Sequence, residues 1–486
     1  GRARVVVTGR AGSGRRSLLA ALAELAGRTL ATIDGAMLIR ERRLDALADL
    51  LRQAHLSGWL PCVDGLDTIA SDDGATRAAV AELLADHAGP LSVRLPRDAP
   101  APLPPGHVRV ELPTAPIGER AAQWTVALAD AGLEVRDVDT LASRFVVGPG
   151  TIQRVVTSVA RLAPAAAPRT ADRAPDRAPD HAVDHAIDHA VDHAVDPAPD
   201  HAVDHAIDAA LRQYLETKLG NVATRVTRLA SWSQIVLPAD IQDSISALLA
   251  RIRHRRTVFD TWGFDRVVST ARGLTALFEG GPGTGKTLVA SAIAAELGLD
   301  LYRVDLSQVM SKWIGETEQN LARVFDAAEE GQALLLFDEA DSLFGKRTEV
   351  RTATDRHANL EVNYLLQRLD SFEGVAVLTT NFGTAIDAAF KRRLSVRLTF
   401  PFPDEAARAA LWRIHLPTRL PIAGDLDLAA LARTYKMSGG YIRNAALRAA
   451  FLAADEHAAL SQDHLERAIR AEFREGGKLA ESGLLE

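Results

Sequence analysis

A glycine-rich segment in the second half of the chain, Gly280–Thr287, restricts the fold more than any other feature. It reads Gly-Gly-Pro-Gly-Thr-Gly-Lys-Thr and follows the apolar run Thr275–Phe278. A helix is expected directly after it, over Leu288–Leu297. Glycines between a strand and a helix let backbone N–H groups face a phosphate, and the helix N-terminus adds positive potential. The pattern therefore predicts an α/β sheet with a phosphate-binding loop after one strand.

Individual residues of this loop have expected roles. Lys286 would reach the β- and γ-phosphates of a nucleotide, and Thr287 would be a ligand of Mg²⁺. The expected nucleotide contacts are Gly281, Pro282, Gly283, Thr284, Gly285, Lys286, Thr287 and Leu288. The alternative is a chance glycine-rich turn, which the strand before the loop and the helix after it argue against.

A second motif follows further along the chain, where the apolar run Leu334–Phe337 ends in Asp338 and Glu339. A buried strand delivers such carboxylates to the edge of the sheet where α/β sites lie. Asp338 would bind the metal, directly or through water, and Glu339 would act as the general base for an attacking water. An acidic strand end alone is ordinary, but after a phosphate-binding loop it predicts hydrolysis of a nucleoside triphosphate.

Strand and helix patterns alternate in both halves of the chain, which predicts parallel sheets with crossover helices. In the first half, strands are expected at Val5–Thr8, Thr29–Ile33, Trp59–Val63, Leu91–Leu95 and Val108–Leu112, and helices at Arg15–Ala26 and Thr76–Asp86. In the second half, strands are expected at Ala276–Phe278, Leu301–Val304, Ala333–Phe337, Val375–Thr379 and Val396–Phe400. Each half ends in helical sequence, and the second helical segment is the longer.

With these motifs in place, residues 230–475 resemble the AAA+ ATPases, and within them the AAA modules that thread protein substrates. Three further segments carry the resemblance: Thr379-Thr380-Asn381, Ala389–Leu394 and Ser438–Arg443. The resemblance implies that Asn381 holds the lytic water or the γ-phosphate. It also implies that Arg392 and Arg393 are arginine fingers that reach a neighbouring subunit's γ-phosphate. The alternative for these two arginines is a solvated basic turn. The resemblance further implies that Gly440, where the family often has alanine, packs on the nucleotide.

The segment Lys312–Glu318 resembles the pore loop of protein unfoldases. The resemblance implies that Trp313, Ile314 and Gly315 line the channel of a ring, where an aromatic side chain grips an extended polypeptide. The alternative is that Trp313 is a buried core residue. The implied cofactors are ATP and Mg²⁺, and the implied partners are further copies of this chain, as a hexamer, and a protein substrate.

We interpret the first half of the chain as a degraded copy of the second. Gly9–Arg16 aligns with Gly280–Thr287, with Arg15 in place of the lysine and Arg16 in place of the threonine. Asp64 aligns with Asp338, but Gly65 replaces the general base. The same alignment puts Pro104 and Pro105 on the two finger arginines, Arg120 on Arg408 and Trp124 on Trp412. The joint loss predicts a domain that does not hydrolyse ATP, as in a tandem-domain bacterial type, and an unrelated Rossmann-like fold is the alternative.

An aspartate recurs at every fourth residue from Asp172 to Asp208. Residues 170–210 hold ten Asp and two Arg, a charge of −8, so the rest of a chain of net charge −7 sums to +1. The apolar residues of the repeat are alanine, proline, valine and two isoleucines, with no leucine, methionine or aromatic residue, which predicts a low-complexity linker. Six histidines from His181 to His205 are an alternative metal-binding ladder. Because the chain outside the repeat is nearly neutral, charge-driven binding to nucleic acid or membrane is not favoured. The alternative function is nevertheless an ATP-dependent nucleic-acid motor or loader.

The expected fold class is α/β, with two parallel-sheet domains of the phosphate-loop type, each followed by a helical lid, the second lid the larger. The expected boundaries are 1–163 for a degenerate ATPase-like domain with a short lid, 164–208 for the linker, 209–264 for a helical segment, 265–403 for the active core and 404–486 for its lid. A single cysteine, Cys62, fits a reducing compartment, so we expect a cytoplasmic protein. The first strand pattern begins at once without a methionine, so we expect the native N-terminus to precede residue 1.

Overall fold

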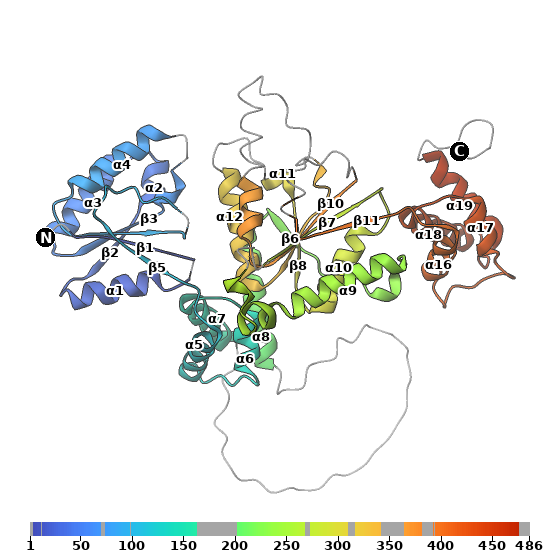
Figure 1. The fold of residues 1–486 in the computed structure, drawn as a ribbon, viewed down its shortest axis with the longest axis horizontal. Coiled ribbons are helices and arrows are strands. Elements are labelled where there is room, and N and C mark those ends of the chain that lie inside the picture. The colour runs from blue at the N-terminus through green and yellow to red at the C-terminus, as the bar shows by residue number, and fades with distance from the viewer. Residues whose placement is uncertain are drawn as a thin grey trace, which may run out of the picture. The chain divides into compact units, whose positions relative to one another are not determined.

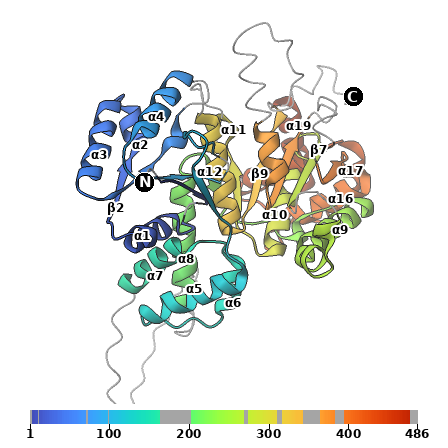
Figure 2. The same cartoon turned by 60° about the vertical axis from the view of Figure 1, so that its left-hand side comes forward.

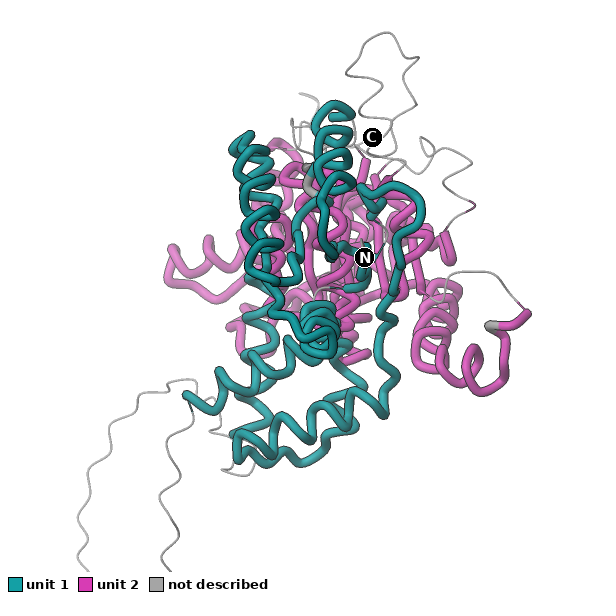
Figure 3. Tube along the Cα trace, turned by 90° about the vertical axis from the view of Figure 1, so that its left-hand side faces the viewer, with its two compact units in different colours: residues 1–69, 73–217 teal, residues 70–72, 218–486 magenta. Residues whose placement is uncertain are grey.

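The computed structural model describes residues 3–10, 12–69, 73–97, 99–162, 202–267, 273–309, 316–341, 364–381, 392 and 394–475. The chain forms two compact units, which divide within one helix between Thr217 and Lys218 (Figure 3). Each unit contains one sheet with helices on both faces, and its strands are parallel except for one edge strand of the second sheet, so the predicted fold class is confirmed. None of the described helices is long and apolar enough to cross a membrane.

The first unit begins with a five-stranded parallel sheet in the order β2-β3-β4-β1-β5. Its elements are β1 Arg4–Gly9, α1 Arg15–Leu25, β2 Leu30–Asp34, α2 Gly35–Arg40, α3 Leu44–Leu56, β3 Leu60–Asp64, η1 Leu66–Thr68, α4 Gly74–Asp86, β4 Leu91–Leu95 and β5 Val108–Leu112. Alternate side chains of a strand point to opposite faces. Val6 therefore packs in the core beneath α2, α3 and α4, and Val7 packs with Leu19 of α1. Helix α1 covers one face of the sheet, and α2, α3 and α4 cover the other (Figure 1).

Four helices follow this sheet: α5 Ile117–Asp130, α6 Val138–Arg144, α7 Pro149–Leu162 and α8 Ala202–Leu219. Trp124, Leu141, Ile152 and Ile207 contribute one buried side chain from each helix to a common core. A fourth helix, α8, therefore completes this lid. It begins at Ala202, within the range 164–208 predicted for the linker, because the last units of the aspartate repeat are helical.

Packing and charge pairing explain why the end of the repeat is helical. Aspartates four residues apart repel each other on a helix, which argues against helix formation. At this end, however, Ile207 is buried in the lid core. Asp208 accepts a hydrogen bond from Arg144 at 2.6 Å and pairs with Arg212 at 3.9 Å. The six-histidine ladder lies outside the described residues except for His205, which is exposed.

The second unit contains a six-stranded sheet in the order β11-β7-β10-β9-β8-β6. Its elements before the lid are β6 Ala223–Arg225, η3 Trp232–Gln234, α9 Ala239–Arg253, η4 Thr257–Thr261, η5 Phe264–Arg266, β7 Leu274–Gly280, α10 Lys286–Leu297, β8 Leu301–Val304, α11 Leu306–Val309, α12 Glu316–Gly331, β9 Leu334–Phe337, β10 Val375–Thr380 and β11 Val396–Phe400. Helices α9 and α10 cover one face of the sheet and α12 the other (Figures 1 and 2). The segment 209–264, predicted to be helical, also contributes β6, which pairs antiparallel with β8.

The lid of the second unit consists of α16 Glu405–His415, α17 Leu428–Thr434, α18 Gly439–Asp455 and α19 Gln462–Glu475. Two contacts of this lid, an arginine–carbonyl hydrogen bond and a buried tryptophan, have equivalents in the first lid. Arg408 Nε donates to the carbonyl of Ala432 at 2.8 Å, and Arg120 Nε donates to the carbonyl of Ala142 at 3.1 Å. Trp412 and Trp124, four residues later in each case, are buried at the centre of the two lid cores. The two lids therefore share one architecture.

The assignment of α8 to the first lid can be tested at Ile207. Replacing this buried side chain by alanine leaves a cavity, so Ile207→Ala should lower the free energy of unfolding by about 2–5 kcal/mol. His205→Ala is the matched control in the same helix and the same repeat. Because His205 is exposed, its replacement should change the free energy of unfolding by less than about 0.5 kcal/mol. Urea unfolding of the full chain measures both, and a parent-like Ile207→Ala variant would show that α8 is not part of the lid core.

Candidate nucleotide site of the second unit

The glycine-rich loop connects the end of β7 to the start of α10. Gly283 and Gly285 have φ values of 74° and 97°, a left-handed region that glycine enters without steric cost. This backbone path leaves the first N–H groups of α10 at the loop, where an anion would be favoured. Of the predicted contact residues, Gly281, Pro282, Gly283, Thr287 and Leu288 are exposed, Thr284 and Gly285 are half-buried, and Lys286 is buried.

The Lys286 ammonium is held inside this loop. Its Nζ donates to the carbonyls of Gly280 at 2.7 Å and Gly281 at 2.9 Å, and to Asn381 Oδ1 at 2.9 Å. An ammonium has three N–H donors, so these acceptors use its whole capacity. Burial lowers the pKa of Lys286, while the nearby carboxylates act to raise it. Binding a phosphate here requires the ammonium to exchange at least one of these acceptors for a phosphate oxygen.

The acidic end of β9 lies beside the loop. Asp338 Oδ1 accepts hydrogen bonds from Thr287 Oγ1 at 2.9 Å and from Thr379 Oγ1 at 2.6 Å. The backbone N–H of Glu339 donates to the same Thr379 Oγ1 at 3.0 Å. Glu339 has a φ of 53°, which is uncommon outside glycine, and its side chain is exposed. The turn after β9 thus separates the two carboxylates, one held by hydroxyl groups and one directed to solvent.

Asp341 holds the asparagine at the end of β10. Asn381 donates to Asp341 from its backbone N–H, at 3.0 Å to Oδ1, and from Nδ2, at 3.3 Å to Oδ2. Thr380 Oγ1 also donates to Asp341 Oδ1. Neither Asp341 nor Thr379 was predicted as a site residue. Their role could have been predicted only from the pairing of β9 with β10, which brings together the residues at the ends of both strands.

Gly440, which was predicted to pack on the nucleotide, contacts the glycine-rich loop. Its backbone N–H donates to the carbonyl of Gly283 at 3.1 Å. A Cβ atom at position 440 would lie 3.2 Å from the Gly283 Cα, so a side chain here would require the loop to shift slightly. The first turn of α18 therefore rests on the glycine-rich loop, and Gly440 approaches the loop backbone closely.

The residues present fit a magnesium nucleotide. Mg²⁺ prefers oxygen ligands and is commonly held by one or two side chains together with phosphates. Thr287 and Asp338 bring a hydroxyl and a carboxylate to one point beside the loop. Within the part of the chain that the structure describes, no three His, Cys, Asp or Glu side chains gather as a metal site. This donor set suits Mg²⁺ shared with phosphates better than a metal enclosed by protein ligands.

Of the remaining predicted site residues, only Arg392 lies within the described part of the chain. Arg392 is described and exposed. Arg393 and the predicted pore loop Trp313, Ile314 and Gly315 lie outside the described residues.

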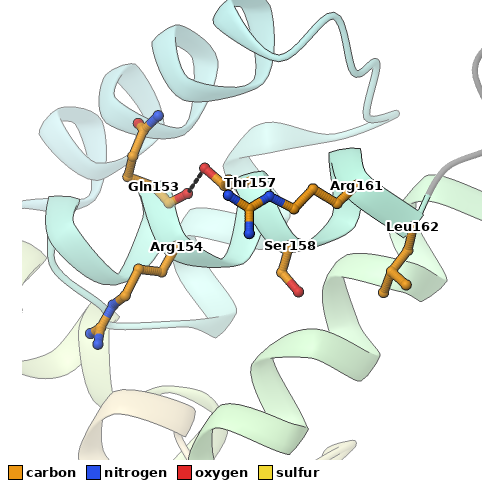
Figure 4. Close-up of a pocket in the computed structure, with 6 residues that line it drawn as sticks. All are labelled: Gln153, Arg154, Thr157, Ser158, Arg161 and Leu162. Carbon is orange, nitrogen blue, oxygen red and sulfur yellow. Dashed lines mark hydrogen bonds between the residues drawn. The ribbon is translucent and has the colours of Figure 1, made fainter.

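A separate surface pocket of about 450 Å³ lies along α7 in the first unit (Figure 4). It is lined by Gln153, Arg154, Thr157, Ser158, Arg161 and Leu162. All six residues belong to one helix, and none is a predicted site residue. The pocket is therefore unrelated to the site at the ends of β7, β9 and β10.

Comparison with known proteins matches the same part of the chain. Residues 276–402 match the family described as "ATPase family associated with various cellular activities (AAA)". The chain is 32% identical over 246 residues to the 26S proteasome subunit RPT4 of Saccharomyces cerevisiae, covering 47% of this chain and 55% of that protein. It is 36% identical over 161 residues to human vacuolar protein sorting-associated protein 4A, covering 32% and 37%.

A third relative is the cell division cycle protein 48 homolog of Archaeoglobus fulgidus, which is 35% identical over 170 residues, covering 34% of this chain and 23% of the relative. The chain thus spans about half or less of the length of these relatives. The family match covers β7, the acidic end of β9, Asn381 and β11, which are the elements that build the site. The part of the chain that matches the AAA ATPase family therefore lies in the second unit.

Proposed function

We propose that the second unit binds ATP with Mg²⁺ and hydrolyses it to ADP and phosphate. The observation that carries the proposal is the junction of three strand ends. There the hydroxyls of Thr287 and Thr379 meet the Asp338 carboxylate, and the Lys286 ammonium meets the Asn381 amide. In this assignment the loop N–H groups and Lys286 bind the phosphates, and Thr287 and Asp338 hold the metal. Bound Mg²⁺ would neutralise charge on the β- and γ-phosphates.

Hydrolysis in this site needs a water positioned at the γ-phosphorus. The Glu339 carboxylate accepts the proton of that water as its oxygen attacks, the bond to ADP breaks, and inorganic phosphate leaves. Asn381 orients the water or the γ-phosphate. Asp341 is a positioning residue in this account, because it fixes both the backbone and the side chain of Asn381.

We further propose that the chain assembles as a homo-oligomeric ring, a hexamer in the family it resembles. Arg392 and Arg393 precede β11 and would reach the γ-phosphate of the neighbouring copy as arginine fingers. The exposure of Arg392 supports its availability to a neighbour. The work of the ring would be to unfold or remodel a protein by threading it past Trp313 and Ile314. Relatives that include a proteasome subunit support a protein substrate.

The first unit, by this proposal, does not hydrolyse ATP. Its sheet has the order β2-β3-β4-β1-β5, which corresponds strand for strand to β8-β9-β10-β7-β11. Its loop glycines also keep the same backbone path, with φ values of 79° at Gly12 and 87° at Gly14. The side chains differ, because Arg15 stands for Lys286 and Gly65 for Glu339. The backbone of the site is retained without the groups that would carry the chemistry.

Glu339→Gln tests the proposed base directly. Loss of a general base should lower the ATP turnover rate about 10²–10⁴-fold, while nucleotide affinity stays close to that of the parent. Glu405→Gln is the matched control, because Glu405 is an exposed glutamate at the start of α16 in the same unit. Steady-state phosphate release and equilibrium ATP binding provide the two measurements. Turnover of the Glu339→Gln variant within twofold of the parent would exclude Glu339 as the base.

Trp313→Ala tests the proposed grip on substrate. We expect the amount of protein unfolded per ATP hydrolysed to fall sharply, because an aromatic contact with the threaded polypeptide is lost. The melting temperature should stay that of the parent. Trp262→Ala, at a tryptophan that is 67% exposed, is the control for loss of an exposed indole. A core role for Trp313 would instead cost about 3–5 kcal/mol of stability, and a large drop in melting temperature would reject the pore-loop assignment.

A further inference from the structure

Strand register identifies which residues of the two units occupy equivalent positions around the strand-end aspartate. Val63 pairs with Val93 in the first unit, as Phe337 pairs with Leu378 in the second. Asp64 and Asp338 each follow directly. On the next strand, Arg94 pairs with Val7 of β1, as Thr379 pairs with Phe278 of β7. Arg94 therefore occupies the position of Thr379, the hydroxyl that holds the aspartate in the second unit.

Arg94 thus stands where the second unit has the neutral hydroxyl of Thr379, and this cation binds both carboxylate oxygens of Asp64. Arg94 Nε donates to Asp64 Oδ1 at 2.7 Å, and Arg94 Nη2 donates to Asp64 Oδ2. The two side chains are 28% and 22% exposed, so the pair is largely shielded from solvent. A bidentate guanidinium–carboxylate contact of this kind is strong and directional. In the second unit, by contrast, Asp338 accepts hydrogen bonds from two threonine hydroxyls, which leave its negative charge available to a metal.

Two further positions of the glycine-rich loop region also carry arginine in the first unit. Arg16 stands where Thr287 supplies a hydroxyl, and it is exposed. Arg15 stands where Lys286 reaches into the loop, but its guanidinium donates to the carbonyl of Leu95 at the end of β4. A second cation therefore lies near the strand end where the second unit has its metal ligands. A divalent ion beside Asp64 would meet the Arg94 guanidinium, would have the Arg15 guanidinium at the end of the neighbouring strand, and would find no threonine hydroxyl at the Thr287 position.

We propose that Arg94 is a built-in substitute for the divalent metal in the first unit. Its guanidinium neutralises Asp64 permanently and closes that position to Mg²⁺, so the state of the first unit does not depend on a magnesium nucleotide. This inference deepens the proposed loss of hydrolysis in the first unit and rests on that assignment. Absence of a base explains why a unit would not hydrolyse ATP, whereas an occupied metal position explains why it would not take up the metal either.

The experiment counts Mn²⁺ bound per chain by electron paramagnetic resonance, in full-length protein carrying Lys286→Ala and Asp338→Asn to disable the second site. Comparison with the same protein carrying Asp64→Asn isolates the Asp64-dependent ion from any bound at other carboxylates. We expect no Asp64-dependent Mn²⁺ while Arg94 is present. With Arg94→Thr, which restores the residue type of the second unit, we expect about one additional Mn²⁺ that Asp64→Asn removes. Arg97→Thr is the control, because it breaks an exposed arginine–glutamate pair in the same unit.

Two results would overturn the proposal. One is an Asp64-dependent Mn²⁺ in the protein that retains Arg94. The other is no gain of Mn²⁺ in a folded Arg94→Thr protein. Arg94→Gln, which keeps the size but not the charge, replaces Arg94→Thr if the latter does not fold. ATP turnover is measured separately, in full-length Arg94→Thr protein with an intact second site. This measurement reports on hydrolysis by the second unit, whereas the Mn²⁺ count reports on Asp64 in the first unit, so the two proposals can fail independently.

Discussion

Parallel pairing of β7 between β10 and β11 is the constraint on which the proposed site depends. The register fixes Thr379 beside Phe278, and β9 is fixed in turn against β10. Because all these strands run in the same direction, the glycine-rich loop, the acidic end of β9 and Asn381 meet at one edge. A shift of one residue in the β9–β10 register would turn Asp338 away from Thr379. The hydrogen bonds that join the loop to the acidic turn exist only in the observed register.

Much of this arrangement is predictable from local sequence, because the strands are short apolar runs and the loop glycines have a recognisable spacing. All ten predicted strands are present, most with bounds shifted by one or two residues. Contacts that depend on register across the sheet could not be predicted in this way. Asp341 and Thr379 acquire partners only once β9 and β10 are adjacent. The pairing of Arg94 with Asp64 likewise joins residues 30 positions apart on different strands.

The helical end of the aspartate repeat escaped prediction for a different reason. Its composition is that of a linker, and its charges repel on a helix. The tertiary contacts of Ile207 and the pairing of Asp208 with Arg144 outweigh that preference. Most of the repeat consequently lies, in the sequence, between the third and fourth helices of the first lid, and its end forms the start of the fourth. The corresponding connection in the second lid is the short segment Glu456–Ser461.

The two units share strand order, loop conformation and lid contacts, yet differ in the charges around one aspartate. In the second unit neutral hydroxyls hold that carboxylate, and in the first unit a guanidinium does. We propose that only the second unit binds a magnesium nucleotide. The most direct test is the number of Mg-ATP molecules bound per chain in the Glu339→Gln protein, measured by equilibrium dialysis. We predict one per chain, and none when Lys286→Ala is added. Two per chain, or one that survives Lys286→Ala, would contradict the account.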